Sequence, residues 1–188
     1  MIFKIIWLKT WLLVLSLLVA LPSFGYSTFH TFTFDALRDS KDVEMLEYRY
    51  GDDGGFNTRS TQTQIQAAKA IMGTHIGGTM KVGDDLYIKW RIKSTGQVIE
   101  DTVDLKSLLP SSIQDHELQP IIDGTQLYVY LISYQPVRPY FSEAEADKIR
   151  RSHITPREKV FTGYGRNRVI MIYPEKQIDP HLPPEMQR

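Results

Sequence analysis

Hydrophobic and polar residues alternate most regularly between residues 84 and 104. Apolar side chains stand at every second position, with polar or amphipathic ones between them, as in Leu86, Ile88, Trp90 and Ile92. A period of two places one apolar and one basic face on opposite sides of a strand. Residues 94–97 have turn composition, and residues 98–104 follow as a second strand. We therefore predict a hairpin whose first strand, residues 84–93, is central to the fold.

Five other segments have the composition or the alternation of strands: residues 26–34, 43–50, 116–123, 126–134 and 168–173. Pro120 interrupts the third of these and favours an edge or a bulge, because proline donates no backbone hydrogen bond. Both faces of residues 126–134 are apolar or aromatic, which predicts a central strand covered on both sides. The strand at 168–173 is predicted to be the last.

Helical signals are short. Residues 65–72 carry a weak helical stripe that Gly73 and the next glycines close off, so a short helix and an irregular segment both remain open. Residues 105–109 predict one helical turn stopped by Pro110. A capping box at 142–145 opens a helix that runs to about residue 151. Together these elements predict a mainly β fold, an antiparallel β-sandwich or open barrel with one or two short helices.

The first 25 residues predict a secretory signal peptide. Lys4 and Lys9 precede the apolar core at 11–20, and the small residues Ser23 and Gly25 stand before a cleavage position ahead of Tyr26. The alternative is an uncleaved inner-membrane anchor, although a spanning helix needs about 20 apolar residues. We expect a soluble periplasmic protein with a single β-rich domain at 26–174. Residues 175–188 form a proline-rich tail with little to bury.

Composition excludes several classes of function. The chain has 22 lysines and arginines against 22 aspartates and glutamates, so no overall charge attracts nucleic acid or anionic lipid. We expect no nucleic-acid partner, and membrane contact only through an uncleaved N-terminal segment. Cysteine is absent, which rules out disulfides, thiolate catalysis, cysteine-based zinc sites and cysteine-linked lipid anchors.

Candidate catalytic and metal-binding groups favour structural readings. Asp52 and Asp53 lack the alternating oxygen ligands and downstream glutamate of a calcium loop. The acids Glu100, Asp101 and Asp104 are interpreted as cross-strand partners of Lys89, Arg91 and Lys93. The histidines show no metal-ligand spacing and are read as surface or hydrogen-bonded strand residues: His30, His75, His116, His153 and His181. We predict no enzyme activity, cofactor, metal or small-molecule substrate.

A surface rich in tyrosine and arginine remains as a candidate for protein binding. Such residues are common at interface hot spots, and tyrosine is equally common on ordinary sheet faces, so both readings stay open. The set comprises Tyr48, Arg49, Tyr50, Tyr87, Tyr128, Tyr130, Tyr140 and Tyr164. The acidic, glycine-rich loop at 51–57 directly follows Tyr48, Arg49 and Tyr50 in the sequence. The predicted partner contacts are Asp52, Asp53, Phe56, Asn57, Tyr48 and Tyr50.

Three blocks carry a family resemblance: GDDLYIKWR followed by TGQVIEDTVDL within residues 83–105, IIDGTQLYVYL at 121–131, and Ile-Tyr-Pro at 172–174. They resemble small exported proteins of Proteobacteria, mostly lipoproteins, encoded beside type VI secretion spike and lipase-effector genes. The resemblance covers residues 43–174. It implies a periplasmic immunity protein that blocks a toxic effector, often a phospholipase. Many relatives carry a lipobox cysteine where this chain has Phe24, Gly25 and Tyr26, so the resemblance here implies a form without a lipid anchor.

Two other functions remain open at this point. One is a structural or adaptor protein of the cell envelope or of the secretion apparatus, which gene neighbourhood would distinguish. The other is an envelope hydrolase, which requires polar groups converging in a pocket.

Overall fold

The computed structural model of the chain describes residues 26–35, 42–52, 55–67, 70–71, 73–137, 142, 144, 148, 151, 155–164 and 166–178. The predicted signal peptide, Asp53, most of the helix predicted from residue 142 and the last ten residues lie outside these ranges.

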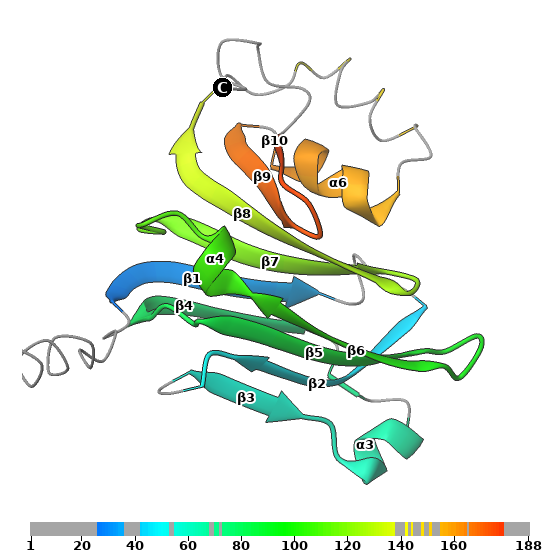
Figure 1. Cartoon of the computed structure of the whole chain (residues 1–188). Coiled ribbons are helices and arrows are strands. Elements are labelled where there is room, and N and C mark those ends of the chain that lie inside the picture. Colours follow the sequence, from blue (N-terminus) through cyan, green and yellow to red (C-terminus); the bar gives the residue numbers. More distant parts are fainter. Residues whose placement is uncertain are drawn as a thin grey trace, which may run out of the picture.

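Two sheets make up the described part of the chain (Figure 1). The six-stranded sheet has the order β10-β9-β8-β7-β1-β4. Its strands are β1 (Ser27–Asp35), β4 (Gly73–Lys81), β7 (His116–Asp123), β8 (Gln126–Pro136), β9 (Asn167–Tyr173) and β10 (Gln177–Ile178). Neighbours in this sheet are antiparallel except β1 and β7, which are parallel.

The four-stranded sheet has the order β3-β2-β5-β6 and is antiparallel throughout the described residues. Its strands are β2 (Val43–Tyr50), β3 (Phe56–Arg59), β5 (Asp85–Ile92) and β6 (Val98–Asp104). The predicted hairpin at 84–104 is therefore confirmed as β5 and β6. The described ranges include three short helices: α3 (Gln62–Gln66), α4 (Leu105–Leu108) and α6 (Pro156–Gly163). α3 and α4 connect one sheet to the other, whereas α6 lies between β8 and β9 of the six-stranded sheet.

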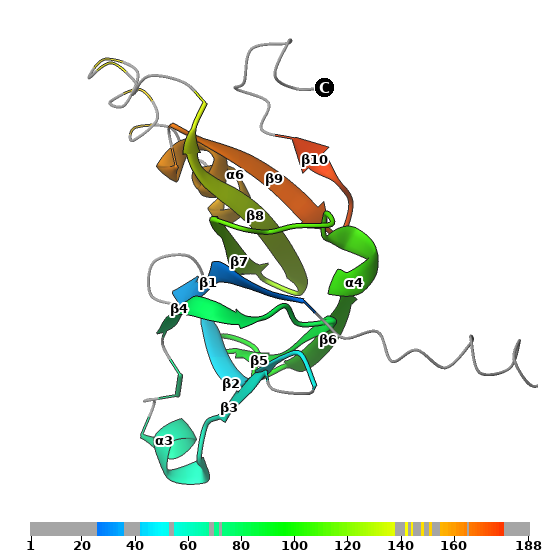
Figure 2. The ribbon, with the colours of Figure 1, turned by 90° about the vertical axis from the view of Figure 1, so that its left-hand side faces the viewer.

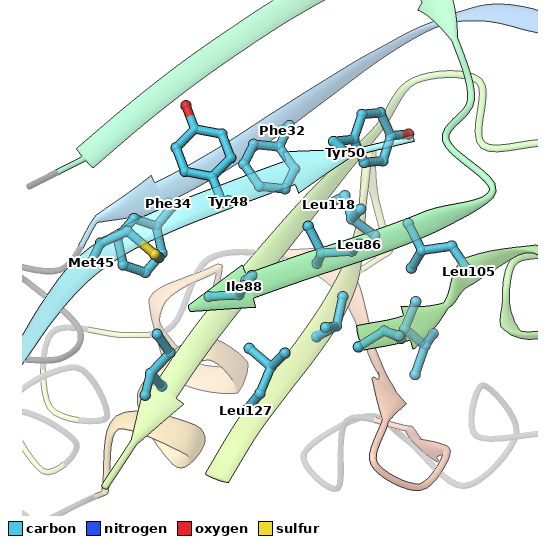
Figure 3. Close-up of a cluster of buried hydrophobic side chains, with 14 of the residues drawn as sticks. Phe32, Phe34, Met45, Tyr48, Tyr50, Leu86, Ile88, Leu105, Leu118 and Leu127 are labelled. Carbon is cyan, nitrogen blue, oxygen red and sulfur yellow. The ribbon is translucent and has the colours of Figure 1, made fainter. Parts of the chain in front are cut away.

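The two sheets pack face to face as a β-sandwich, which confirms the predicted fold class. Inward side chains of both sheets meet in one core, including Phe32 from β1, Tyr50 from β2 and Leu127 from β8 (Figure 3). The alternation noted in the sequence is the cause, because Leu86, Ile88 and the other even-numbered residues of β5 are buried.

A second apolar cluster lies on the outer face of the six-stranded sheet, where α6 covers β7, β8 and β9 (Figure 2). Tyr130 and Phe161 make an edge-to-face contact with ring centroids 5.6 Å apart. The cluster confirms that β8 is covered on both sides. The helix itself was not predicted, because Val160 and Phe161 are adjacent and give no helical period.

β4 corrects the reading of the glycines at 73, 77 and 78. The sequence predicts that they close the ambiguous segment at 65–72, yet residues 73–81 pair with β1 along their whole length. Glycine is unfavourable in a strand, but nine consecutive partners on β1 outweigh that local preference. Phe56 and Asn57, predicted in a loop, likewise belong to a strand, because β3 pairs with β2 from Tyr50 to Glu47.

β7 is internal to its sheet, although Pro120 favoured an edge. The pairing between β1 and β7 spans only His116 to Leu118, and Pro120 lies two residues beyond it. Pro120 is therefore paired with β8 alone, and the sheet tolerates its missing donor there. β10 follows β9, which was predicted to be last, and lies within the stretch predicted as a tail.

Candidate binding surface

Tyr48 and Tyr50, two of the predicted contact residues, lie in the core. Their exposed fractions are 2% and 0%, and their rings pack against Phe32 and Phe56 at centroid distances of 5.1–5.9 Å. The prediction of surface contacts is therefore wrong for these two tyrosines. The side chains of Tyr48 and Tyr50 both point toward the other sheet. Their aromatic rings therefore pack between the two sheets and not on the surface of the protein.

A buried hydrogen bond joins the sheets beside these rings. His30 Nδ1 lies 3.0 Å from the carbonyl oxygen of Thr28, which can only accept, so Nδ1 carries the proton. In the neutral imidazole Nε2 is then the acceptor, and the Tyr50 hydroxyl donates to it at 2.8 Å. This agrees with the interpretation of His30 as a hydrogen-bonded strand histidine.

Acid is expected to destabilise the protein through His30. Burial lowers the pKa of His30 below 6.5, against the opposing effect of its hydrogen bond to Thr28. The unfolded chain therefore binds the proton first, and stability falls as the pH drops below about 6.5 and through the folded pKa. Urea unfolding between neutral and mildly acidic pH should show a smaller acid loss for His30→Gln than for the wild type. An equal loss in both proteins would show that His30 is not responsible.

The acidic loop retains two of the predicted contact residues at the surface. Asp52 and Asn57 are exposed, whereas Phe56 is half-buried against the core. Gly51 has a φ of 68° and fits closely against Gly83, whose Cα would lie 2.9 Å from a Cβ added at Gly51. A side chain at either glycine would push the β2–β3 turn away from the β4–β5 turn.

The outer face of the four-stranded sheet carries rows of charged side chains, and we call it the charged face. Its members are Glu44, Glu47, Arg49, Arg59, Asp85, Tyr87, Lys89, Arg91 and Glu100. No described helix packs on it. One row crosses all four strands with alternating sign: Arg59, Glu47, Lys89 and Glu100. The face therefore has fixed, mixed charge and little net charge.

Two ion pairs hold this row in place. Arg59 donates two hydrogen bonds to Glu47, at 2.9 and 2.7 Å. Lys89 Nζ lies 3.1 Å from Glu100, and hydrogen bonding by Lys89 lowers the pKa of that carboxyl group. Exposed pairs of this kind add little to stability, so their main effect is to fix side-chain position.

The predicted cross-strand pairing is confirmed for Lys89 and Glu100 and wrong for other members of the set. Arg91 pairs with Glu44 of β2. Asp101 accepts a hydrogen bond from the Tyr173 hydroxyl at 2.8 Å. Asp104 caps α4 through the backbone N–H of Ser107. β5 lies between β2 and β6, so its basic residues can pair with acids of either strand. The sequence of the β5–β6 hairpin does not show that β2 is the second neighbour.

Arg49 of β2 and Tyr87 of β5 lie opposite one another on the two inner strands of the charged face, toward the β2–β3 turn. Arg49 Cζ is 5.7 Å from the centroid of the Tyr87 ring, within cation–π range. Arg49 also donates to Asp85 at 2.7 Å and lies 3.3 Å from Asp52. The Tyr87 hydroxyl donates to Glu100 at 3.0 Å. Both residues were noted in the sequence. Tyr87 shares a face of its strand with Lys89 by alternation, whereas Arg49 joins that face only through the pairing of β2 with β5.

The described residues lack two kinds of feature, a metal-binding cluster and a membrane-spanning helix. They hold no group of three histidine, aspartate or glutamate side chains placed to bind a metal ion. None of their helices has the length and apolar character needed to cross a membrane. No family model, curated protein or solved structure matches the chain.

Proposed function

We propose that the protein is an exported binding protein that inhibits a secreted effector by occluding it, without catalysis of its own. On this proposal it is a periplasmic immunity protein against a phospholipase-type effector of type VI secretion. The sequence resemblance supplies this biological context. The observation that carries the binding function is the charged face, with Arg49 and Tyr87 held together on its two inner strands.

The geometry of this face suits protein recognition. Tyrosine and arginine are enriched among residues that dominate binding energy, and they are most effective near the middle of an interface. Their ion pairs and hydrogen bonds already fix their positions, which reduces the entropy lost on binding. Mixed charge with little net charge favours a partner of matching polar pattern over a uniformly charged polymer. We expect an interface of about 1,200–2,000 Å².

The proposed contact set therefore differs from the one predicted from sequence. Asp52 and Asn57 remain in it because they are exposed at the end of the same sheet. Arg49 and Tyr87 replace the buried tyrosines. Phe56 supports the surface from beneath, where it packs against the core.

Co-production with the effector encoded by the adjacent gene tests the proposal. The wild-type protein should protect cells when the effector is directed to the periplasm, and it should be recovered with the effector in a pull-down. Arg49→Ala and Tyr87→Ala should each weaken binding about 30-fold, which corresponds to the 2 kcal/mol of a hot-spot residue.

Glu175→Ala is the matched control, because Glu175 is exposed and follows β9 of the other sheet. It should bind and protect like the wild type. Absence of any complex, or of protection by the wild type, would remove the proposed function. If Arg49→Ala and Tyr87→Ala both bind like the wild type, the effector contacts a surface other than the charged face.

A further inference from the structure

β4 is an edge strand with no neighbour on its outer side in the described part of the chain (Figure 2). It is nine residues long and pairs with β1 alone. Every second residue, at 73, 75, 77 and 79, is exposed, and the residues between them are only half-buried. A Cβ added at Gly78 would meet nothing within 4 Å, so the inner side of this edge is open as well.

The pairing with β1 shows which backbone groups of β4 point outward. The Phe29 carbonyl accepts a hydrogen bond from Asp115 N–H at 2.9 Å, so it faces β7 and not β4. Phe29 lies opposite Thr79, which is therefore in a non-hydrogen-bonded pair. Because such pairs alternate in an antiparallel ladder, the N–H and C=O groups of residues 73, 75, 77, 79 and 81 point away from β1.

β4 lacks the features that normally protect a sheet edge. Natural edge strands are kept short or carry charged residues and proline. Among the described edges, β3 and β10 have four and two residues, and β6 carries Glu100, Asp101 and Asp104. β4 has no proline, and its one charged residue, Lys81, is at its end. It is the edge most suited to accept another strand.

We propose that β4 pairs antiparallel with β4 of a second copy of this chain, which joins the two six-stranded sheets across a twofold axis. Centring the axis on Gly77 pairs all nine residues, the longest register available. His75 then lies opposite Thr79 of the other copy, and residue 73 lies opposite residue 81. The positions with outward N–H and C=O groups face one another, as an antiparallel ladder requires.

Charge and apolar contact both favour a second copy in this register. No like charges meet along the strand. Lys81 of one copy lies opposite Gly73 of the other, which has no side chain and whose β1 neighbour is Asp35. The Lys81 ammonium group can therefore reach across Gly73 toward an opposite charge in each half of the dimer. Ile76 and Met80, half-buried at the open edge, lose further exposure when the second strand covers them.

A single strand pair buries less accessible surface than a typical stable complex, in which about 1,200 Å² or more is buried. The dimer should therefore form with micromolar or weaker affinity. β4 belongs to the sheet opposite the charged face. The dimer therefore leaves that face free, and the inference does not depend on the proposed function.

Sedimentation of the purified protein, over a wide concentration range, tests the dimer. The wild type should pass from monomer to dimer as concentration rises. Thr79→Pro removes an outward N–H while leaving the β1 ladder intact, and should be monomeric throughout. Thr79→Ala keeps that N–H and should dimerise like the wild type. The double variant His75→Lys, Thr79→Lys places like charges opposite one another and should also be monomeric, more so at low salt.

Cysteine crosslinking tests the register, because the chain has no cysteine of its own. His75→Cys combined with Thr79→Cys places thiols in a pair with Cα atoms about 5.5 Å apart, within disulfide range. It should form a covalent dimer on oxidation. His75→Cys alone places the two thiols four residues apart along the strands and should stay uncrosslinked.

Two outcomes would overturn the inference. One is a wild type that is monomeric at every concentration. If Thr79→Pro then also abolishes protection against the effector, β4 accepts a strand of the effector instead of a second copy. The other is a dimer that persists in Thr79→Pro and in the lysine variant while both keep wild-type circular dichroism.

Discussion

Replacing Trp90 with alanine is expected to lower the free energy of unfolding by about 3–5 kcal/mol, the cost of a large cavity in a packed core. Trp90 is 1% exposed in the middle of β5, and its Nε1–H donates to the carbonyl oxygen of Gly124 at 3.1 Å. That bond ties the four-stranded sheet to the β7–β8 turn of the other sheet. Alanine removes both the ring and the bond, so the two sheets lose one of their main contacts.

Urea unfolding followed by far-ultraviolet circular dichroism measures this loss, since Trp90 is the one tryptophan in the described part of the chain and its replacement removes the fluorescence signal from the core. Trp90→Phe is the matched control. It retains most of the apolar volume and leaves the Gly124 carbonyl without its donor, and should cost about half as much as alanine. A loss below about 1 kcal/mol for Trp90→Ala would show that the sandwich does not depend on this packing.

Alkaline pH is expected to destabilise the protein through Tyr50. Burial raises the pKa of the Tyr50 hydroxyl to about 12, against the opposing effect of a backbone hydrogen bond from Gly83. The unfolded chain loses this proton near pH 10 and the folded chain only near pH 12. Stability from Tyr50 is therefore complete below pH 10 and is lost between pH 10 and 12. The two-unit difference corresponds to about 2–3 kcal/mol.

Unfolding free energies measured from pH 9 upward, for the wild type and Tyr50→Phe, test this expectation. The variant should start lower at neutral pH, by about 1–2 kcal/mol, because His30 Nε2 loses its donor. Its further loss at alkaline pH should then be smaller than that of the wild type. Tyr173, whose pKa is also raised to about 12, is more exposed and should add a smaller loss common to both proteins. Equal alkaline losses in the two proteins would show that Tyr50 does not carry the effect.

Local pattern was sufficient for most of the strands. β2, β5 and β6 were located within one residue of their observed ends, because their alternation and the turn at 94–97 are both properties of neighbouring residues. β8 was recognised as central because both of its faces are apolar. β4 and α6 were not predicted, because neither has a clear local pattern. Their stability comes from partners distant in the chain, β1 for one and the outer face of β7–β9 for the other.

The candidate site shows the same division. The sequence identified tyrosine and arginine as interface types, and it identified Asp52 and Asn57 as surface residues. It did not separate Tyr50, which is buried, from Tyr87, which lies on the charged face. Both stand in alternating segments, and only the partner sheet decides which face of each strand is covered.

The sequence by itself determined that this is a mainly β protein built around the hairpin at 84–104, because alternation along a strand is a local property. Only the tertiary structure decided which tyrosines are core and which are surface, which acid each basic residue pairs with, and that β4 is left as an open edge. Those features depend on which strands lie side by side and on what packs against each face of a sheet. Both are set by contacts between residues distant in the chain, which a local pattern does not show.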